Sequence, residues 1–139
     1  MAIPLTTIHA DRVVNQITQN LTGLQRDMVR NANTHKAMAT AQSPPLATLQ
    51  AFVADSAQEY LRRLQWLIDL RNDPVRRQRM VNILNQRGWT EADITDVATP
   101  LRQAAIALRD APRSTYAEII TACNNLLATV DPPDSLWPE

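Results

Sequence analysis

Cysteine is almost absent from this sequence. Cys123 is the only one among 139 residues, so no disulfide, thiolate metal cluster or redox pair can form within the chain. This cysteine usage is typical of a reducing compartment, and the fold has to be held by packing alone. A chain of this length buries roughly two thirds of its unfolded surface on folding, which suffices for one core. We therefore expect a single domain over residues 1–139.

Long apolar runs and a secretion signal are also lacking. No run approaches the roughly 18 apolar residues that a membrane span requires. The start "MAIPLTTIHADR" has neither the basic beginning nor the apolar centre of a signal peptide. The formal net charge is zero, which argues against general electrostatic capture of polyanions. These absences predict an intracellular protein, or one assembled inside a cell, without a membrane partner.

Glycine is scarce, and proline lies at apparent boundaries. The chain has two glycines and nine prolines, and helical spacing of apolar residues recurs without strand-like alternation. This pattern predicts an all-α bundle of about five helices, over residues 7–41, 44–71, 74–87, 91–111 and 115–130. The fourth helix should be kinked at Pro100, because proline lacks the amide donor of a helix interior. The proline-rich residues 131–139 should form an extended tail.

Several predicted helix ends carry recognisable caps. Short polar side chains accept hydrogen bonds from free amides at a helix start, and glycine adopts the left-handed conformation at a helix end. The predicted N-caps are Ser43, Asp73, Thr90 and Thr115, with Asp93 and Glu118 completing capping boxes, Trp89 closing on Ile94, and Gly88 as a terminator.

The first predicted helix carries a heptad-like seam. Its positions are Ala10, Val14, Ile17, Leu21, Leu24, Met28, Asn31, His35 and Met38. Such a seam packs along a second long helix, so the first two helices should form an antiparallel spine. Gly23 costs this helix about 1 kcal/mol relative to alanine. Asn31 and His35 either fix the register from a buried position or lie in solvent beyond the core, and the solvent-exposed interpretation is favoured.

No combination of residues suggests catalysis, a metal or a cofactor. His9 and His35 are 26 residues apart on one predicted helix, about 39 Å, so they cannot share a site. Cys123 falls on an apolar stripe, which favours an inert core thiol. Neither glycine has a second one near enough to build a phosphate loop. Two acidic pairs have helical spacing but no third ligand: Asp55 with Glu59, and Asp93 with Asp96. We expect a protein that is not an enzyme.

Arginines concentrate in the middle of the chain. The stretch "YLRRLQWLIDLRNDPVRRQRM", residues 60–80, holds six of the thirteen. Residues 60–79 are net +4 and residues 80–139 are net −4, so copies of the chain can pair through unlike regions. Nucleic-acid binding is the alternative, and it would use Arg62, Arg63, Arg76, Arg77 and Arg79. It is disfavoured, because the first two have acidic neighbours one helical turn away and the last two point about 160° apart.

Residues 78–97 also match the spacing of a helix-turn-helix, with Gly88 in the turn. The second helix of that unit would carry Glu91, Asp93 and Asp96, which repel a phosphate backbone. Two helices meeting at a capped turn explain the same residues without DNA.

Some apolar residues lie away from the main apolar face of the second predicted helix. Phe52, Trp66 and Leu70 form a second stripe, which either another helix of the bundle covers or a partner protein contacts. Leu136 and Trp137 stand in the tail, where they either fold back or dock on a neighbour. The predicted partner-binding residues are Phe52, Arg62, Arg63, Trp66, Leu70, Arg76, Arg77, Arg79, Leu136 and Trp137.

The C-terminal third carries a family resemblance. The run "TPLRQAAIALRDAP", followed by "TYAEIITACNNLLATV" and "PPDSLWPE", resembles small all-helical virion proteins of tailed bacteriophages, which decorate capsids or sit in the neck and tail. The resemblance implies a structural protein present in many copies, without an active site, whose surfaces are subunit contacts. The expected partners are copies of itself or other virion proteins within a large oligomer, and the expected location is the virion, assembled in the host cytoplasm.

Overall fold

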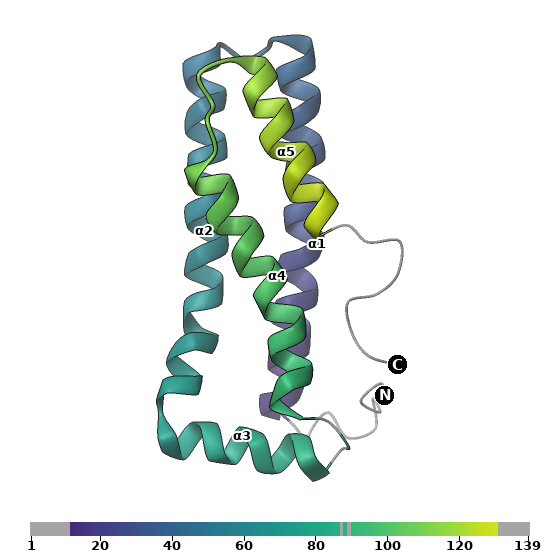
Figure 1. Ribbon diagram of the computed structural model, residues 1–139, viewed down its shortest axis with the longest axis vertical. Coiled ribbons are helices and arrows are strands. Elements are labelled where there is room, and N and C mark those ends of the chain that lie inside the picture. The colour runs from purple at the N-terminus through teal and green to yellow at the C-terminus, as the bar shows by residue number, and fades with distance from the viewer. Residues whose placement is uncertain (1–11, 87, 89, 131–139) are drawn as a thin grey trace.

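The chain folds into an all-α bundle of five helices (Figure 1). The computed structural model describes residues 12–86, 88 and 90–130. The helices are α1 (Arg12–Ala41), α2 (Leu46–Asn72), α3 (Pro74–Gln86), α4 (Glu91–Asp110) and α5 (Tyr116–Val130). These residues contain no strand, so the predicted fold class is confirmed. The predicted start of the first helix at residues 7–11, the contact of Trp89 and the tail at 131–139 lie outside the described residues.

Four helices run along the bundle and one lies across its end. α1 and α2 form the long antiparallel pair that the seam predicted, and α4 and α5 pack over that pair (Figure 1). α1 makes its most extensive contact with α5, and α2 makes its own with α4. α3 crosses the end of the bundle that is remote from the α1–α2 connection (Figure 1). Its position leaves one of its sides against the bundle and the other facing outward.

The buried side chains form one cluster along the predicted apolar faces. The confirmed positions are Ile17, Leu21, Leu24 and Met28 on α1; Leu49, Val53, Ala57, Tyr60, Leu64 and Leu67 on α2; Ile94, Leu101, Ala105 and Leu108 on α4; and Ile119, Cys123, Leu126 and Val130 on α5. Five further positions of these stripes are only half-buried: Met38, Leu46, Tyr116, Ile120 and Leu127. α3 adds Met80 and Leu84, which are completely buried and hold it to the bundle.

The connection between α1 and α2 differs from the prediction. Ser43 does not cap α2, which begins at Leu46 after Pro45 without a side-chain cap. Instead the Ser43 amide donates to the Met38 carbonyl at 3.1 Å, and the Gln42 amide donates to the Ala39 carbonyl at 3.2 Å. Gln42 has a φ of 53°, so these bonds form the left-handed closing motif of a helix. Ser43 therefore belongs to the closing turn of α1, and Pro45 takes the N-cap position of α2.

The other predicted N-caps are confirmed where the structure describes them, although Glu118 accepts from the Thr115 hydroxyl at 3.3 Å and does not complete the predicted capping box. Asp73 Oδ1 accepts hydrogen bonds from the amides of Val75 and Arg76, each at 3.1 Å. The Thr90 amide donates to Asp93 Oδ2 at 2.8 Å in a capping box, and the Glu118 amide donates to Thr115 Oγ1 at 3.1 Å. Gly88 has a φ of 76°, as a left-handed terminator requires. α4 is a single helix that continues through Pro100.

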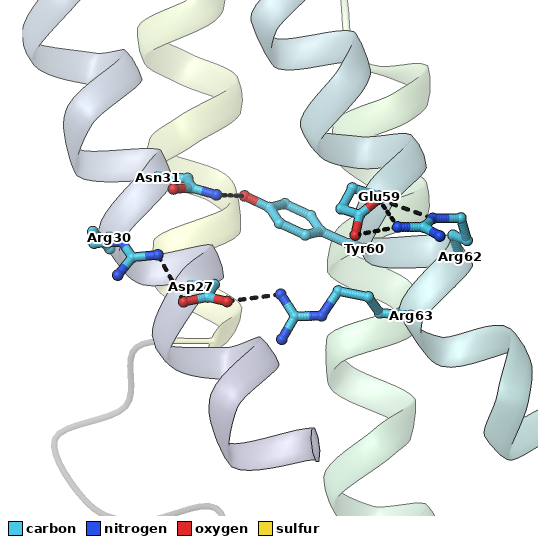
Figure 2. Close-up of polar contacts among 7 residues, drawn as sticks. All are labelled: Asp27, Arg30, Asn31, Glu59, Tyr60, Arg62 and Arg63. Carbon is cyan, nitrogen blue, oxygen red and sulfur yellow. Dashed lines mark hydrogen bonds and ion pairs between the residues drawn. The ribbon is translucent and has the colours of Figure 1, made fainter. Parts of the chain in front are cut away.

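The polar C-terminal third of α1 is covered by the bundle, so the favoured solvent-exposed interpretation was wrong. Asn31 Nδ2 donates to the hydroxyl of Tyr60 on α2 at 3.0 Å (Figure 2). His35 is half-buried, and burial lowers the pKa of its imidazole because the charged form loses water. Ala32 and Ala39 on the same helix are buried. The helix end does not outrun the core, because α2 and α5 both continue alongside it (Figure 1).

Both ends of α5 are tied to other elements by hydrogen bonds. At its start, the Tyr116 hydroxyl donates to the Pro44 carbonyl in the α1–α2 connection at 2.8 Å. At its end, Gln25 Nε2 on α1 donates to the Val130 carbonyl at 2.9 Å. These two bonds lie a helix length apart, so they fix the position of α5 along α1.

Candidate functional site

Two of the predicted partner-binding arginines form ion pairs with α1 and α2 (Figure 2). Arg62 is 76% exposed and pairs with Glu59 on its own helix, with Nη2 and Oε2 at 2.7 Å. Arg63 reaches from α2 to α1, where its Nη1 lies 2.7 Å from Asp27 Oδ2. The same carboxylate accepts from Arg30 at 2.8 Å. Arg63 therefore joins α2 to α1. The pair of Arg62 with Glu59 is exposed, and such pairs contribute little to stability.

A third ion-pair group joins three helices at the end of the bundle. Glu91, in the first turn of α4, accepts from Arg77 Nε on α3 at 3.0 Å and from Arg71 Nε on α2 at 3.4 Å. The hydrogen bond from Arg77 lowers the pKa of the Glu91 carboxyl below its usual range. Sequence reasoning treated Glu91 as a charge that repels phosphate and missed these pairs. Arg77 thus has a carboxylate partner within the chain.

Arg76 and Arg79 are different, because neither guanidinium group has a hydrogen-bond or ion-pair partner among the described residues. Together with Gln16, Trp66 and Leu70 they line a cavity of about 250 Å³ between α1, α2 and α3. The structure therefore brings four predicted partner-binding residues to one place: Trp66, Leu70, Arg76 and Arg79. Trp66 packs against the core with one part and reaches the cavity with another. Leu70 is only 5% exposed, so it is not the exposed anchor that was predicted.

A second hollow lies on the outward side of α3. It has a volume of about 570 Å³ and is lined by Pro74, Val75, Gln78, Arg79, Asn82 and Ile83. Val75 is 79% exposed, and Arg79 borders both hollows. Sequence reasoning did not select Val75. The signal was present, because α3 is apolar on two faces: Val75 lies about 180° around the helix from the buried Leu84.

The remaining predicted residues do not line the two hollows beside α3. Phe52 is 42% exposed on α2, but it precedes Trp66 by 14 residues, or about 21 Å of helix. Arg62 belongs to its pair with Glu59. Leu136 and Trp137 lie outside the described residues. The eight of the ten predicted residues that the structure describes therefore separate into the α3 end of the bundle, the α1–α2 ion pairs, and Phe52 apart from both.

The single thiol of the chain is not among the residues that line the two hollows at the α3 end. Cys123 is buried in the core, and burial raises the pKa of its thiol to about 11, which keeps it protonated at neutral pH. Within residues 12–130, as far as the structure describes them, no three histidine, cysteine or acidic side chains gather to hold a metal. Among the described helices, none combines the length and apolar character needed to cross a membrane.

Comparisons of the chain with protein-family models, with curated proteins and with solved structures return no match. The fold and the α3 end of the bundle are therefore interpreted from their own chemistry.

Proposed function

We propose that the protein is a non-enzymatic structural subunit of a multi-subunit assembly, and that the outward side of α3 contacts a neighbouring subunit. The exposed apolar surface around Val75, bordered by Arg79, is the observation that carries this proposal. A bacteriophage particle assembled in the host cytoplasm is the proposed setting. That part is supported by the resemblance of the C-terminal third to virion proteins.

The composition of the α3 end suits a protein interface. Single exposed aliphatic residues are common on protein surfaces, so Val75 alone would carry little weight. Here it adjoins a cavity lined by Trp66 and two arginines without carboxylate partners. Tryptophan and arginine are enriched among the residues that dominate binding energy, and apolar groups occupy the centre of such contacts. The net negative residues 80–139 of another copy supply the opposite charge.

Nucleic acid is a weaker candidate for the same surface. Of the five arginines that were considered for it, Arg62, Arg63 and Arg77 have carboxylate partners in the chain. Only Arg76 and Arg79 remain, and two neutralised phosphates give a salt slope of about −1.8 on a double-logarithmic plot. Two phosphate contacts supply little of the electrostatic free energy on which nucleic-acid binding depends.

The proposed interface is tested by sedimentation equilibrium of the full chain over a wide concentration range. We expect reversible association that Val75→Glu weakens at least about 10-fold, because the new charge would have to be desolvated in the contact. Ala117→Glu is the matched control, since Ala117 is also exposed and also the second residue of its helix. It should leave association unchanged.

Two results would count against the proposal. If the chain stays monomeric at every concentration, it does not associate with itself and the proposed interface is wrong. Association that survives Val75→Glu places the contact away from α3. Binding to a 40-base-pair duplex with a slope much steeper than about −1.8 would instead favour the nucleic-acid alternative.

A further inference from the structure

The cavity between α1, α2 and α3 and the end of the chain have complementary chemistry. The cavity presents the indole of Trp66, the edge of Leu70 and the guanidinium groups of Arg76 and Arg79. Residues 131–139 read "DPPDSLWPE", which places adjacent Leu136 and Trp137 among three carboxylates, those of Asp131, Asp134 and Glu139. An acidic segment with a central aromatic pair is the kind of ligand that such a cavity accepts.

From this match we infer that residues 131–139 of one copy bind in the Trp66–Arg79 cavity of a second copy. The inference rests on the proposed function and makes it specific, because it names the segment that one subunit offers to the next. Trp137 packs against Trp66 and Leu70, while the flanking carboxylates pair with Arg76 and Arg79. Aromatic pairs and charge-assisted hydrogen bonds are both among the stronger local interactions in proteins.

The state of the two arginines supports this assignment. The four other arginines of residues 60–80, namely Arg62, Arg63, Arg71 and Arg77, have acidic partners, whereas Arg76 and Arg79 have none within the described part of the chain. Both side chains are exposed beside a half-buried indole. Arginine also stacks on indole rings and binds carboxylates through two parallel hydrogen bonds. Two unpaired guanidinium groups at one cavity therefore favour an acidic, aromatic occupant.

Geometry favours the segment of a second copy over the segment of the same copy. The Val130 carbonyl is bonded to Gln25 on α1, while Gln16 lines the cavity nine residues earlier. Nine residues correspond to about 14 Å along the helix and about 180° around it, so the shortest path over its surface is about 22 Å. The seven residues from Val130 to Trp137 span at most about 25 Å when fully extended. Only a nearly fully extended chain lying directly on α1 would bring Trp137 to the cavity of its own copy, whereas the segment of a second copy is under no such constraint.

The arrangement allows a small set of symmetries. The cavity and the segment are different surfaces of the chain, so each subunit gives its end to one copy and receives an end from the same copy or from another. Such a contact produces a two-fold dimer that exchanges its ends, a closed ring or an open filament.

The test uses two defective variants of the full chain and their mixture. One variant carries Arg76→Glu and Arg79→Glu, and it keeps an intact C-terminal segment. The other carries Leu136→Ser and Trp137→Ser, and it keeps an intact cavity. Each variant alone should associate at least about 30-fold more weakly than the unaltered chain, which is the usual effect of losing a dominant contact residue. A 1:1 mixture should form a dimer and stop there, because only one productive contact remains.

Controls separate this inference from loss of fold and from a simple charge effect. Circular dichroism should show that all variants keep their helix content. Arg26→Glu with Arg102→Glu is the matched charge control, because both side chains are exposed and without a partner among the described residues. It should associate as the unaltered chain does.

The outcomes are distinct for the two proposals. A C-terminal variant that associates normally, or a mixture that does not recover the dimer, overturns the inference. If Val75→Glu still weakens association in that case, the proposed function stands without it. If the unaltered chain is monomeric throughout, both fail.

Discussion

Arginine is paired with a carboxylate in the middle of the α1–α2 pair, whereas two arginines at the α3 end of the bundle are not. In the middle, Arg63 binds Asp27 across the helix pair, and Asn31 binds the Tyr60 hydroxyl (Figure 2). At the α3 end, Arg76 and Arg79 lie beside an indole with no acidic partner among the residues described. The difference shows that the position of an arginine in the fold, and not its place in a basic run, decides its role.

The comparison predicts that the two sides of α3 differ greatly in their effect on folding. Leu84→Ala removes a completely buried side chain and should cost about 3 kcal/mol of unfolding free energy, measured by urea denaturation. Val75→Ala, on the outward side where Val75 is 79% exposed, should cost less than about 1 kcal/mol. Equal losses would mean that α3 has no outward side available for a partner.

The middle of the bundle is predicted to depend on its polar contact. Tyr60→Phe keeps the buried ring but leaves Asn31 without its acceptor, so the unfolding free energy should fall by about 1–2 kcal/mol. Asn31→Ala in the Tyr60→Phe background should cost less than Asn31→Ala alone, with a coupling of about 1 kcal/mol. Strictly additive losses would show that the two side chains act independently.

The two glycines lie in the two regions compared, Gly23 in the α1–α2 pair and Gly88 after α3, and their replacement should have opposite effects. A Cβ on Gly23 would meet only Arg63 Nη2, at the ordinary contact distance of 3.8 Å, so Gly23→Ala should stabilise the protein by about 1 kcal/mol. Gly88 has a φ of 76°, so Gly88→Ala should destabilise it by about 1 kcal/mol. Thermal unfolding of both variants checks the opposite signs. A destabilising Gly23→Ala would show that the helix pair is closer there than the structure indicates.

The smallest expected effect concerns Glu91, which ties α3 to the bundle without being part of its outward side. Its folded-state pKa is lowered, chiefly by Arg77, so its contribution to stability is present above the unfolded value near 4.5 and is lost as the pH falls through the lower folded value. Glu91→Gln should therefore lower the urea midpoint slightly at pH 7, and this difference should shrink as the pH falls below 4.5. A difference that persists in acid would point to packing instead of charge.

The fold was largely predictable because its signals are local. Apolar spacing gave the buried faces of α2 and α4, and the caps at Asp73, Thr90 and Gly88 gave helix boundaries. Ser43 was assigned wrongly because the same short polar residue suits a helix start and a helix end. Its choice depends on Gln42 adopting a left-handed conformation, which sequence does not favour for glutamine.

The candidate site was predictable only in part, because it depends on which side chains face one another. The basic run and Trp66 were found from composition, but local spacing did not identify the carboxylates that Arg63 and Arg77 contact. Their partners, Asp27 and Glu91, are 36 and 14 residues away in the chain. Asn31 was misjudged for the same reason, since its partner Tyr60 comes from another helix.

The hydrogen bonds at the two ends of α5 have a consequence for any assembly that this chain builds. With Tyr116 held to Pro44 and Val130 held to Gln25, α5 cannot slide along α1 by a helical turn without losing both bonds. The place where residues 131–139 leave the body is thereby constant from one molecule to the next. Copies joined through residues 131–139 would therefore repeat at a regular interval, because the segment always begins at the same point of each subunit.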